Sequence, residues 1–290
     1  MKISELIKSD KLSLSIEVFP PKTDTVFESV KEATEKIAAL GPRFMSVTYG
    51  AGGGTSKYTL AIAQDIQEQY EVPTLAHLTC VSSSKETVVR QIAAIKKAGI
   101  ENVMALRGDI PAGHEHEDRS HWDYRYATDL VRDLKEMGDF CIGGACYPEI
   151  HPDSANQKED IAHLKEKADA GCEFFTTQMF FDNNLLYNFL YKIREAGITV
   201  PVFPGIMPIT NANQIERALK LSGSHVPQRF KSLVDKFGDD PAAMKQAGIA
   251  YATDQIIDLY ANGIKNVHLY SMNKPEVAQK IMENLSDILK

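Results

Sequence analysis

Short runs of hydrophobic residues alternate along the chain with longer segments in which hydrophobic residues recur every three or four positions. The short runs are rich in β-branched and aromatic residues and predict strands, whereas the longer spacing predicts amphipathic helices. The predicted strands cover residues 14–19, 44–48, 74–79, 102–106, 140–146, 174–178, 202–206 and 266–270. The predicted helices lie near residues 25–40, 57–69, 85–98, 122–137, 156–170, 183–196, 211–221, 240–262 and 274–289.

This alternation predicts an α/β fold: a single (β/α)8 TIM barrel of parallel strands, with one domain over residues 1–290. Several predicted helices end at a glycine cap, and the next strand follows within a few residues. These glycines are Gly99, Gly138, Gly171, Gly197 and Gly263. An open doubly wound sheet is the alternative, but it usually carries a G-x-G-x-x-G turn after its first strand, and none is present here. The polar segment 222–241 is predicted to be an irregular excursion or a short extra helix.

Polar side chains gather at the predicted carboxyl ends of the strands, where (β/α)8 barrels carry their active sites. They are Glu17, Thr48, His77, Thr79, Arg107-Gly108-Asp109, residues 147–151, Gln178 and residues 270–274, with Met207 an apolar exception. A barrel end that serves only for stability does not need so many polar residues. The pattern therefore predicts a binding site for a large polar ligand at this end of the barrel.

Three of these residues suggest specific chemistry. Glu17 interrupts a hydrophobic strand that Pro20-Pro21 ends, so it is either an ion-paired carboxylate or a proton donor whose pKa is raised by burial. We favour the proton donor. Arg107 is either part of a local ion pair or the ligand of an anion. Gln178 can both donate and accept hydrogen bonds, which suits recognition of a heterocycle.

Composition narrows the function classes. The chain has 43% hydrophobic and 24% charged residues and a net charge of −7, with no basic stripe, so we expect no nucleic-acid partner. No hydrophobic stretch is long enough to span a membrane, and no secretory segment is visible. The four cysteines form no C-x-x-C pair and predict buried side chains in a reducing, cytoplasmic setting. The histidines of "GHEHEDRSH" (113–121) match no zinc spacing, so we expect no metal.

An ordered set of motifs covers nearly the whole chain: "IEVFPPK", "VTYGAGG", "AHLTC", "LRGD", "YATDL", "YPEIHP", "TTQMFFD", "PGIMPIT" and "LYSMNK". Together they resemble the methylenetetrahydrofolate reductase family, in its bacterial, catalytic-domain form. The resemblance implies noncovalent FAD and ping-pong hydride transfer from NAD(P)H, with NADH favoured, to 5,10-methylenetetrahydrofolate, giving 5-methyltetrahydrofolate. It also implies a homo-oligomer that serves one-carbon metabolism and methionine biosynthesis.

The resemblance also assigns residues. It implies FAD contacts from Thr48, His77, Leu106, Arg107, Gly108, Asp109, Tyr126, Ala127, Tyr147, His151, Asp160 and Lys167. It implies folate contacts from Glu17, Gln178, Gln214 and Lys274. Glu17 and Asp109 would be catalytic: Glu17 would protonate folate N10, directly or through water, and Asp109 would place negative charge beside the flavin.

Two positions depart from the family pattern. The family often has arginine where this chain has Lys274, and some members carry a stacking aromatic residue near the position of Ala218-Leu219. Two other functions remain as alternatives. One is another barrel flavoenzyme, of the proline-dehydrogenase kind, which would not explain the pair of Glu17 and Gln178. The other is a non-enzymatic binding module that displays Arg107-Gly108-Asp109 as an adhesion tripeptide.

Overall fold

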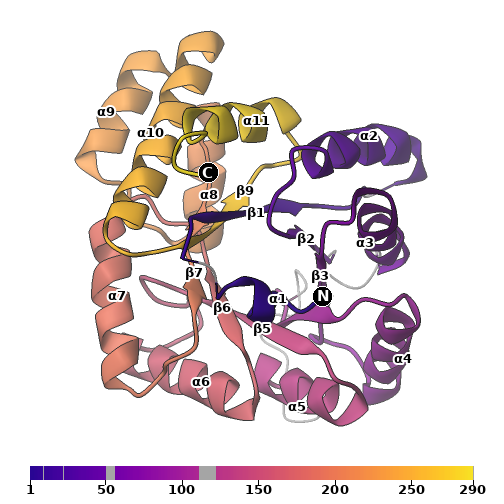
Figure 1. The fold of residues 1–290 in the computed structure, drawn as a ribbon. Helices are drawn as coiled ribbons and strands as arrows, with labels where there is room; N and C mark the ends of the chain where they lie inside the picture. Colours follow the sequence, from indigo (N-terminus) through magenta and orange to yellow (C-terminus); the bar gives the residue numbers. More distant parts are fainter. Residues whose placement is uncertain (9, 22, 50–55, 111–121, 290) are drawn as a thin grey trace.

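The computed structural model describes residues 1–8, 10–21, 23–49, 56–110 and 122–289. Its strands form a parallel barrel surrounded by helices (Figure 1), which confirms the predicted fold. They are β1 (Ser13–Val18), β2 (Met45–Val47), β3 (Thr74–Thr79), β4 (Asn102–Leu106), β5 (Cys141–Cys146), β6 (Phe174–Thr177), β7 (Val202–Phe203), β8 (Gly205–Ile206) and β9 (Asn266–Tyr270). Their order is β7-β6-β5-β4-β3-β2-β1-β9-β8, and neighbouring strands run parallel.

The predicted seventh strand is divided into β7 and β8 at Pro204, which has no backbone N–H to donate to a neighbouring strand. β7 pairs with β6, and β8 pairs with β9, so this one segment joins the two sides of the sheet. Gly205 N donates to Thr177 Oγ1 at 2.8 Å. A Cβ on Gly205 would lie 2.5 Å from both Thr177 O and Tyr270 Oη, so the close approach requires glycine.

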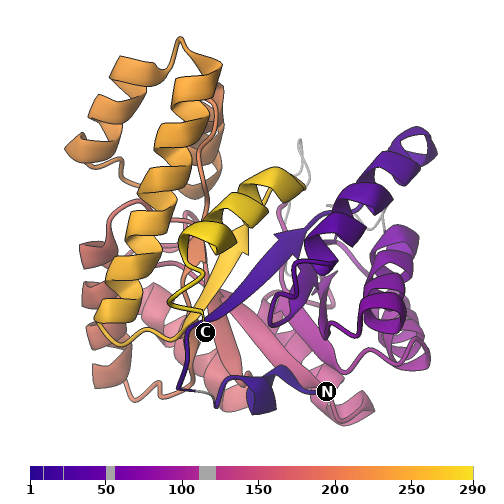
Figure 2. The same ribbon diagram turned by 45° about the horizontal axis from the view of Figure 1, so that its top comes forward.

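Each of the nine predicted helices is present in the predicted order, and one of them begins later than predicted. The structure adds two further α-helices, α1 (Ile3–Leu6) and α9 (Gln228–Phe237). The other helices are η1 (Asp24–Val26), α2 (Phe27–Ala38), α3 (Ser56–Tyr70), α4 (Lys85–Lys97), α5 (Ala127–Met137), α6 (Gln157–Ala170), α7 (Asn183–Glu195), α8 (Asn213–Ser222), α10 (Pro241–Ala261) and α11 (Pro275–Asn284). α1 was not predicted, and α9 is the extra helix of segment 222–241. α9 and the adjoining half of α10 project beyond the barrel (Figure 2).

The start of α5 differs from the prediction, which placed it near residue 122. The Asp129 carboxylate accepts hydrogen bonds from the backbone N–H groups of Arg125 and Tyr126, at 3.1 Å and 3.2 Å. These bonds cap the helix at Tyr126, so the preceding residues do not join it. Gly138 is the C-cap of this helix, as predicted, and adopts an extended φ of −174°.

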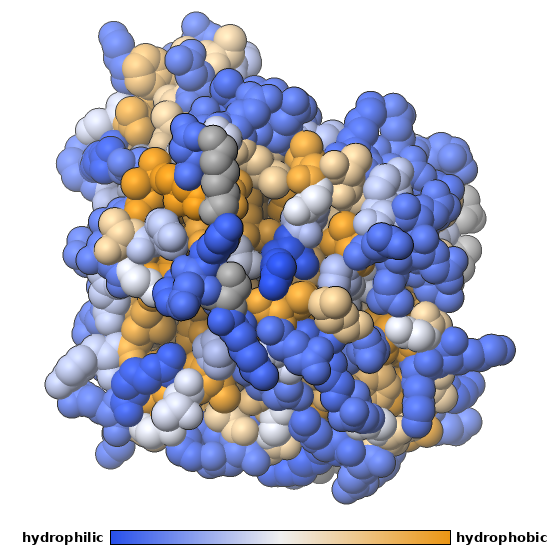
Figure 3. Space-filling view, in the orientation of Figure 1, coloured by the Kyte–Doolittle hydropathy of each residue, from blue (hydrophilic) through white to orange (hydrophobic). Residues whose placement is uncertain are grey.

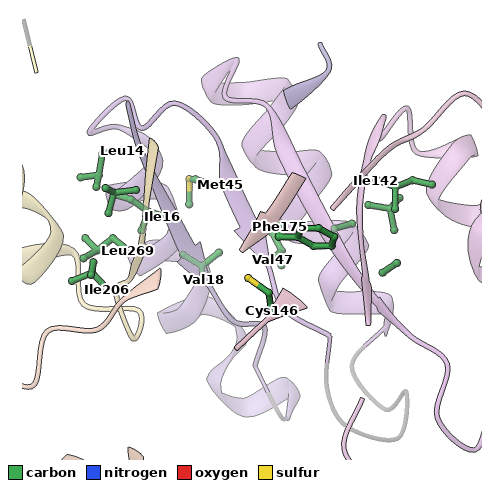
Figure 4. Packing of buried hydrophobic residues seen from close by; sticks show 14 of the residues in the cluster. Leu14, Ile16, Val18, Met45, Val47, Ile142, Cys146, Phe175, Ile206 and Leu269 are labelled. Carbon is green, nitrogen blue, oxygen red and sulfur yellow. The ribbon is translucent and has the colours of Figure 1, made fainter. Parts of the chain in front are cut away.

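Strand residues alternate between the barrel interior and the surrounding helices. On β1, Leu14, Ile16 and Val18 belong to the large cluster between barrel and helices, where they lie near Leu269 and Ile206 (Figure 4). The residues between them, including Ser15 and Glu17, therefore face the interior. All four cysteines are buried and unpaired, as predicted.

The amino-terminal end of the barrel interior is filled with hydrophobic side chains. Ile3 and Leu6 of α1 form a separate cluster there with Phe44, Leu75, Met104, Cys141, Phe174 and Phe203. Ile3 N donates to the Asn102 side chain at 2.8 Å, which fixes α1 against the strand ends. On the face of the molecule shown in Figure 3, hydrophobic side chains concentrate toward the middle and hydrophilic ones surround them.

Candidate active site

Glu17 lies among polar side chains that β1, β2, β3 and β9 direct into the barrel interior, toward the carboxyl-terminal ends of the strands. Ser46 Oγ lies 3.4 Å from Glu17 Oε2 and 3.0 Å from His268 Nε2. His268 Nδ1 is in turn 2.7 Å from Ser15 Oγ. A chain of hydrogen-bonding groups therefore runs from the Glu17 carboxylate into the buried interior.

His77 contacts the other side of this carboxylate, with Nε2 3.7 Å from Glu17 Oε2. Burial lowers the pKa of His77 to about 4, while Glu17 acts to raise it and His268 acts to lower it further. The imidazole is therefore neutral near pH 7. Its buried Nε2 makes no hydrogen bond within the described part of the chain. The Glu17 side chain keeps 21% of its surface exposed, so the carboxylate remains open to a ligand at the mouth.

A cavity of about 720 Å³ opens at the carboxyl ends of β4 and β5. Ten of the twelve residues predicted to bind FAD line it: Leu106, Arg107, Gly108, Asp109, Tyr126, Ala127, Tyr147, His151, Asp160 and Lys167. The other two lie elsewhere. The Thr48 backbone pairs with Val18, and His77 belongs to the Glu17 cluster. The lining also includes residues that the sequence did not single out: Tyr49, Ala105, Arg125, Thr128, Ala145, Asp153, Ser154, Glu159 and His163.

Two cations contribute to the cavity wall. Arg107 Nη2 lies 2.7 Å from Asp153 Oδ2, and Arg107 Nε donates to Gly108 O at 3.3 Å. Lys167 Nζ donates to Ala145 O, and burial lowers the pKa of Lys167. Lys167 could exchange its backbone carbonyl for a phosphate oxygen, which is a stronger acceptor, whereas Arg107 would bind an anion with the guanidinium donors that Asp153 leaves open or in place of Asp153.

Aromatic side chains form other parts of the wall. Tyr126 is 47% exposed and stacks on His163, with ring centroids 4.8 Å apart. Tyr147 and His151 meet edge to face at 4.5 Å. Burial raises the pKa of Tyr147 to about 12, so its hydroxyl stays a neutral hydrogen-bond donor. Flat rings beside anion-binding cations, in a cavity of this volume, fit a dinucleotide such as FAD.

The remaining predicted folate residues lie around a second part of the mouth. Gln214 Oε1 accepts hydrogen bonds from Thr210 N at 2.8 Å and from Thr210 Oγ1 at 3.3 Å. Lys274 Nζ donates to the same Thr210 hydroxyl at 2.8 Å. The structure thus brings Gln214 and Lys274 together through Thr210, which the sequence analysis did not identify. Gln178 directly follows β6, and its Oε1 accepts from Met179 N at 2.9 Å.

One sequence prediction concerns histidines that the structure does not describe. His114, His116 and His121 lie outside them. Within the described ranges, no group of three His, Cys, Asp or Glu side chains is arranged to hold a metal ion. The same ranges contain no helix that is both long and apolar enough to cross a membrane.

Comparison with known proteins identifies the family of this chain. The sequence matches the family described as methylenetetrahydrofolate reductase over residues 2–286. The chain belongs to the methylenetetrahydrofolate reductase family. This agrees with the resemblance carried by the sequence motifs.

Two relatives show how the chain compares with other members of the reductase family. The 5,10-methylenetetrahydrofolate reductase of Pectobacterium carotovorum is 35% identical over 95% of this chain and 90% of its own length. Methylenetetrahydrofolate reductase (NADH) 1 of Zea mays is 37% identical over 98% of this chain but only 50% of its own length. The chain therefore spans about half the length of the maize protein and nearly all of the bacterial one.

A solved structure supports the fold of this reductase family member. An uncharacterized protein from Clostridium thermocellum, described as binding two copies of 5-methyl-5,6,7,8-tetrahydrofolic acid, superimposes with a TM-score of 0.66. The superposition covers 98% of each chain at 14% identity. At that identity the likeness supports the barrel fold alone.

The motif resemblance led us to expect that this chain lacks a stacking aromatic residue near Ala218. The structure shows where the Ala218 side chain lies. Ala218 is 2% exposed and packs in a hydrophobic cluster beneath α8, α9 and α10, together with Met179, Phe230 and Tyr251. A small side chain here adds nothing to the mouth. Phe19, two residues after Glu17, is instead a large hydrophobic side chain with 36% of its surface exposed.

Proposed function

We propose that this chain reduces 5,10-methylenetetrahydrofolate to 5-methyltetrahydrofolate with NAD(P)H and bound FAD, in two half-reactions that share one site. The main support is the placement of Glu17. It is a partly exposed carboxylate beside a neutral His77, and the wide cavity opens at the same, carboxyl-terminal end of the barrel strands. Membership of the reductase family supports the same reaction class.

The cavity is the proposed FAD site. Arg107 and Lys167 would bind the negatively charged diphosphate, and Tyr126 and Tyr147 offer aromatic surfaces to the rings. FAD, when bound, supplies the hydride acceptor and donor that link nicotinamide oxidation to folate reduction. Asp109 places a negative charge at the cavity wall, which favours a cationic folate over a neutral one.

Glu17 is the proposed acid of the folate half-reaction. It holds a proton for N10 of the folate ring, delivered directly or through water, because opening of that ring requires protonation of the leaving nitrogen. Ser46 and His268 hold the carboxyl group from its buried side, while its exposed side can take up a new proton from solvent at the mouth. Gln178, Gln214 and Lys274 would bind the folate, with Lys274 directed at the glutamate carboxylate.

We further propose NADH as the reductant, because the maize relative is named as an NADH enzyme. A homo-oligomer that serves one-carbon metabolism and methionine biosynthesis is part of the same proposal. The adhesion alternative is disfavoured by Arg107, whose side chain is 21% exposed and whose guanidinium is paired with Asp153 in the cavity wall.

The proposal is tested with purified protein. We expect it to be yellow, to be bleached anaerobically by NADH, and to be reoxidised by methylenetetrahydrofolate with formation of methyltetrahydrofolate. A colourless protein that does not bind added FAD contradicts the cofactor assignment. Bleaching by proline, with no reoxidation by folate, would favour the proline-dehydrogenase kind of enzyme.

A further inference from the structure

Side chains of the turn between β9 and α11 hold the end of β1. The paired register of β1 and β9 ends with Glu17 opposite Tyr270. Beyond it, Ser271 Oγ donates to Glu17 O at 2.8 Å. Asn273 Oδ1 accepts from Phe19 N at 3.0 Å, and Asn273 Nδ2 donates to Phe19 O at 2.8 Å. A single amide side chain thus replaces the hydrogen bonds that a neighbouring strand would make.

The backbone of this turn is unusual. Lys274 N donates to Ser271 O at 3.1 Å, which closes a four-residue turn. Both central residues are left-handed, with φ of 55° at Met272 and 52° at Asn273. Asparagine tolerates this region, but methionine rarely adopts it. Such conformations persist where the surroundings hold them in place, and they cluster at functional sites.

The same turn reaches the other side of the mouth. Lys274, its last residue, donates to Thr210 Oγ1, which in turn donates to Gln214 Oε1. One short turn therefore contacts the strand that carries Glu17 and also Thr210, which is bonded to Gln214 at the start of α8. On its opposite edge, the end of β1 is held by Thr48 N, which donates to Val18 O at 3.0 Å. Pro20 and Pro21, which follow, have no backbone N–H to add.

We propose that Asn273 is a positioning residue for the folate half-reaction. It fixes Glu17 and Phe19 relative to Lys274 and Gln214, while Asn273 does not line the cavity at β4 and β5. The assignment rests on the function proposed above. It predicts that loss of the Asn273 amide disturbs proton delivery to folate and leaves FAD binding and flavin reduction intact.

The test is the Asn273→Gly variant. Glycine adopts a positive φ freely, so the change removes both hydrogen bonds to Phe19 while the turn is retained. We expect reoxidation of the reduced flavin by methylenetetrahydrofolate to slow about tenfold or more, since small misplacements of catalytic groups have effects of this scale. NADH-dependent flavin reduction and the FAD dissociation constant should stay within about twofold of wild type.

Glu71→Gly is the matched control. Glu71 is also a left-handed residue that is not glycine, with φ of 55°, but it precedes β3 at the opposite end of the barrel. The Glu71→Gly variant should leave the rates of both half-reactions unchanged. Ser271→Ala, which removes only the bond to Glu17 O, should slow the folate half-reaction less than Asn273→Gly. It also serves as the test if the glycine variant fails to fold.

The outcomes separate this assignment from the proposed function. If the wild-type protein is reoxidised by methylenetetrahydrofolate but the variants slow neither half-reaction, or slow both equally, the positioning role is wrong while the function stands. If the wild-type protein is not reoxidised by methylenetetrahydrofolate, the function and the positioning role are wrong together.

Discussion

The two ends of the barrel interior are built by the same strands and differ in chemistry. At the amino-terminal end, Leu75, Met104 and Phe174 pack with α1 in a hydrophobic cluster. Toward the carboxyl-terminal end, β3 instead presents His77, and β1 presents Glu17. Leu75 and His77 are two residues apart on one strand and share its inward face. Depth along the strand therefore decides whether an inward residue stabilises the fold or serves the site.

We call the hydrophobic cluster at the amino-terminal end the lower layer, and the polar side chains toward the carboxyl-terminal end the upper layer. The comparison indicates that the lower layer stabilises the fold and that the upper layer serves the chemistry. Substitutions in the lower layer should lower the free energy of unfolding with little effect on the half-reactions of folded protein. Substitutions in the upper layer should change the half-reactions and, at neutral pH, leave the free energy of unfolding nearly unchanged. The predictions below run from the largest expected effect to the smallest; those for Phe174 and Lys274 test the two sides of the division, and that for His77 tests where it ends, in acid.

Phe174→Ala should be the most destabilising change. Phe174 is fully buried and meets the Phe203 ring edge to face at 5.3 Å. Its truncation should lower the free energy of unfolding by about 3–5 kcal/mol. Chemical denaturation of FAD-free protein measures this loss. At a temperature where the variant is folded, both half-reactions should match those of wild type; a selective loss of one would contradict the division between layers.

His77 should make stability fall in acid. The folded-state pKa of about 4 lies below the ordinary histidine value of 6.5, so the folded protein binds fewer protons than the unfolded chain between these two pH values. The contribution of His77 to the free energy of unfolding is therefore fully present above pH 6.5. It decreases as the pH falls, and about 2–3 kcal/mol is lost near pH 4. Glu17 and His268 face this imidazole and contribute to its pKa. Denaturation curves at pH 7 and pH 4.5 should differ less for His77→Gln than for wild type; equal differences would refute this cause.

Lys274→Ala should have the smallest effect. Lys274 is bonded to Thr210 rather than to a group needed for folding, and its ammonium is proposed to bind the folate glutamate. The KM for folate should rise about tenfold, on the scale of one lost charge-assisted hydrogen bond. The KM for NADH should change little. Lys274→Arg, which introduces the residue that the motif resemblance leads us to expect here, should keep or lower the folate KM. Equal changes for both substrates would show that Lys274 does not distinguish them.

Much of the fold could be predicted because parallel barrel strands are nearly continuous hydrophobic runs. β3, β4 and β9 have the predicted bounds. α1 was missed because four residues give no helical period, and the start of α5 was misplaced because the Asp129 cap follows polar residues that also suit a helix. The division at Pro204 depends on pairing with two different strands, which the local sequence does not indicate.

The site was predictable to the extent that its residues end strands. Arg107, Asp109 and Tyr147 line the cavity because β4 and β5 are neighbours in the sheet. Asp153 and Thr210 were missed because their contacts arise between loops distant in sequence, and neither residue type stands out in a polar loop. Asn273 likewise acquires its role only through the side chain's reach to Phe19.

The central claim is that Glu17 is the acid of the folate half-reaction, and Glu17→Gln with anaerobic stopped-flow of each half-reaction tests it most directly. Glutamine keeps the volume and hydrogen-bonding shape of the side chain but cannot deliver a proton. The account predicts that flavin reduction by NADH stays within about tenfold of wild type. Reoxidation by methylenetetrahydrofolate should fall at least ~10²-fold. If both half-reactions slow equally, Glu17 acts by packing or by positioning the cofactor; if neither slows, the proton comes from another group and the claim is wrong.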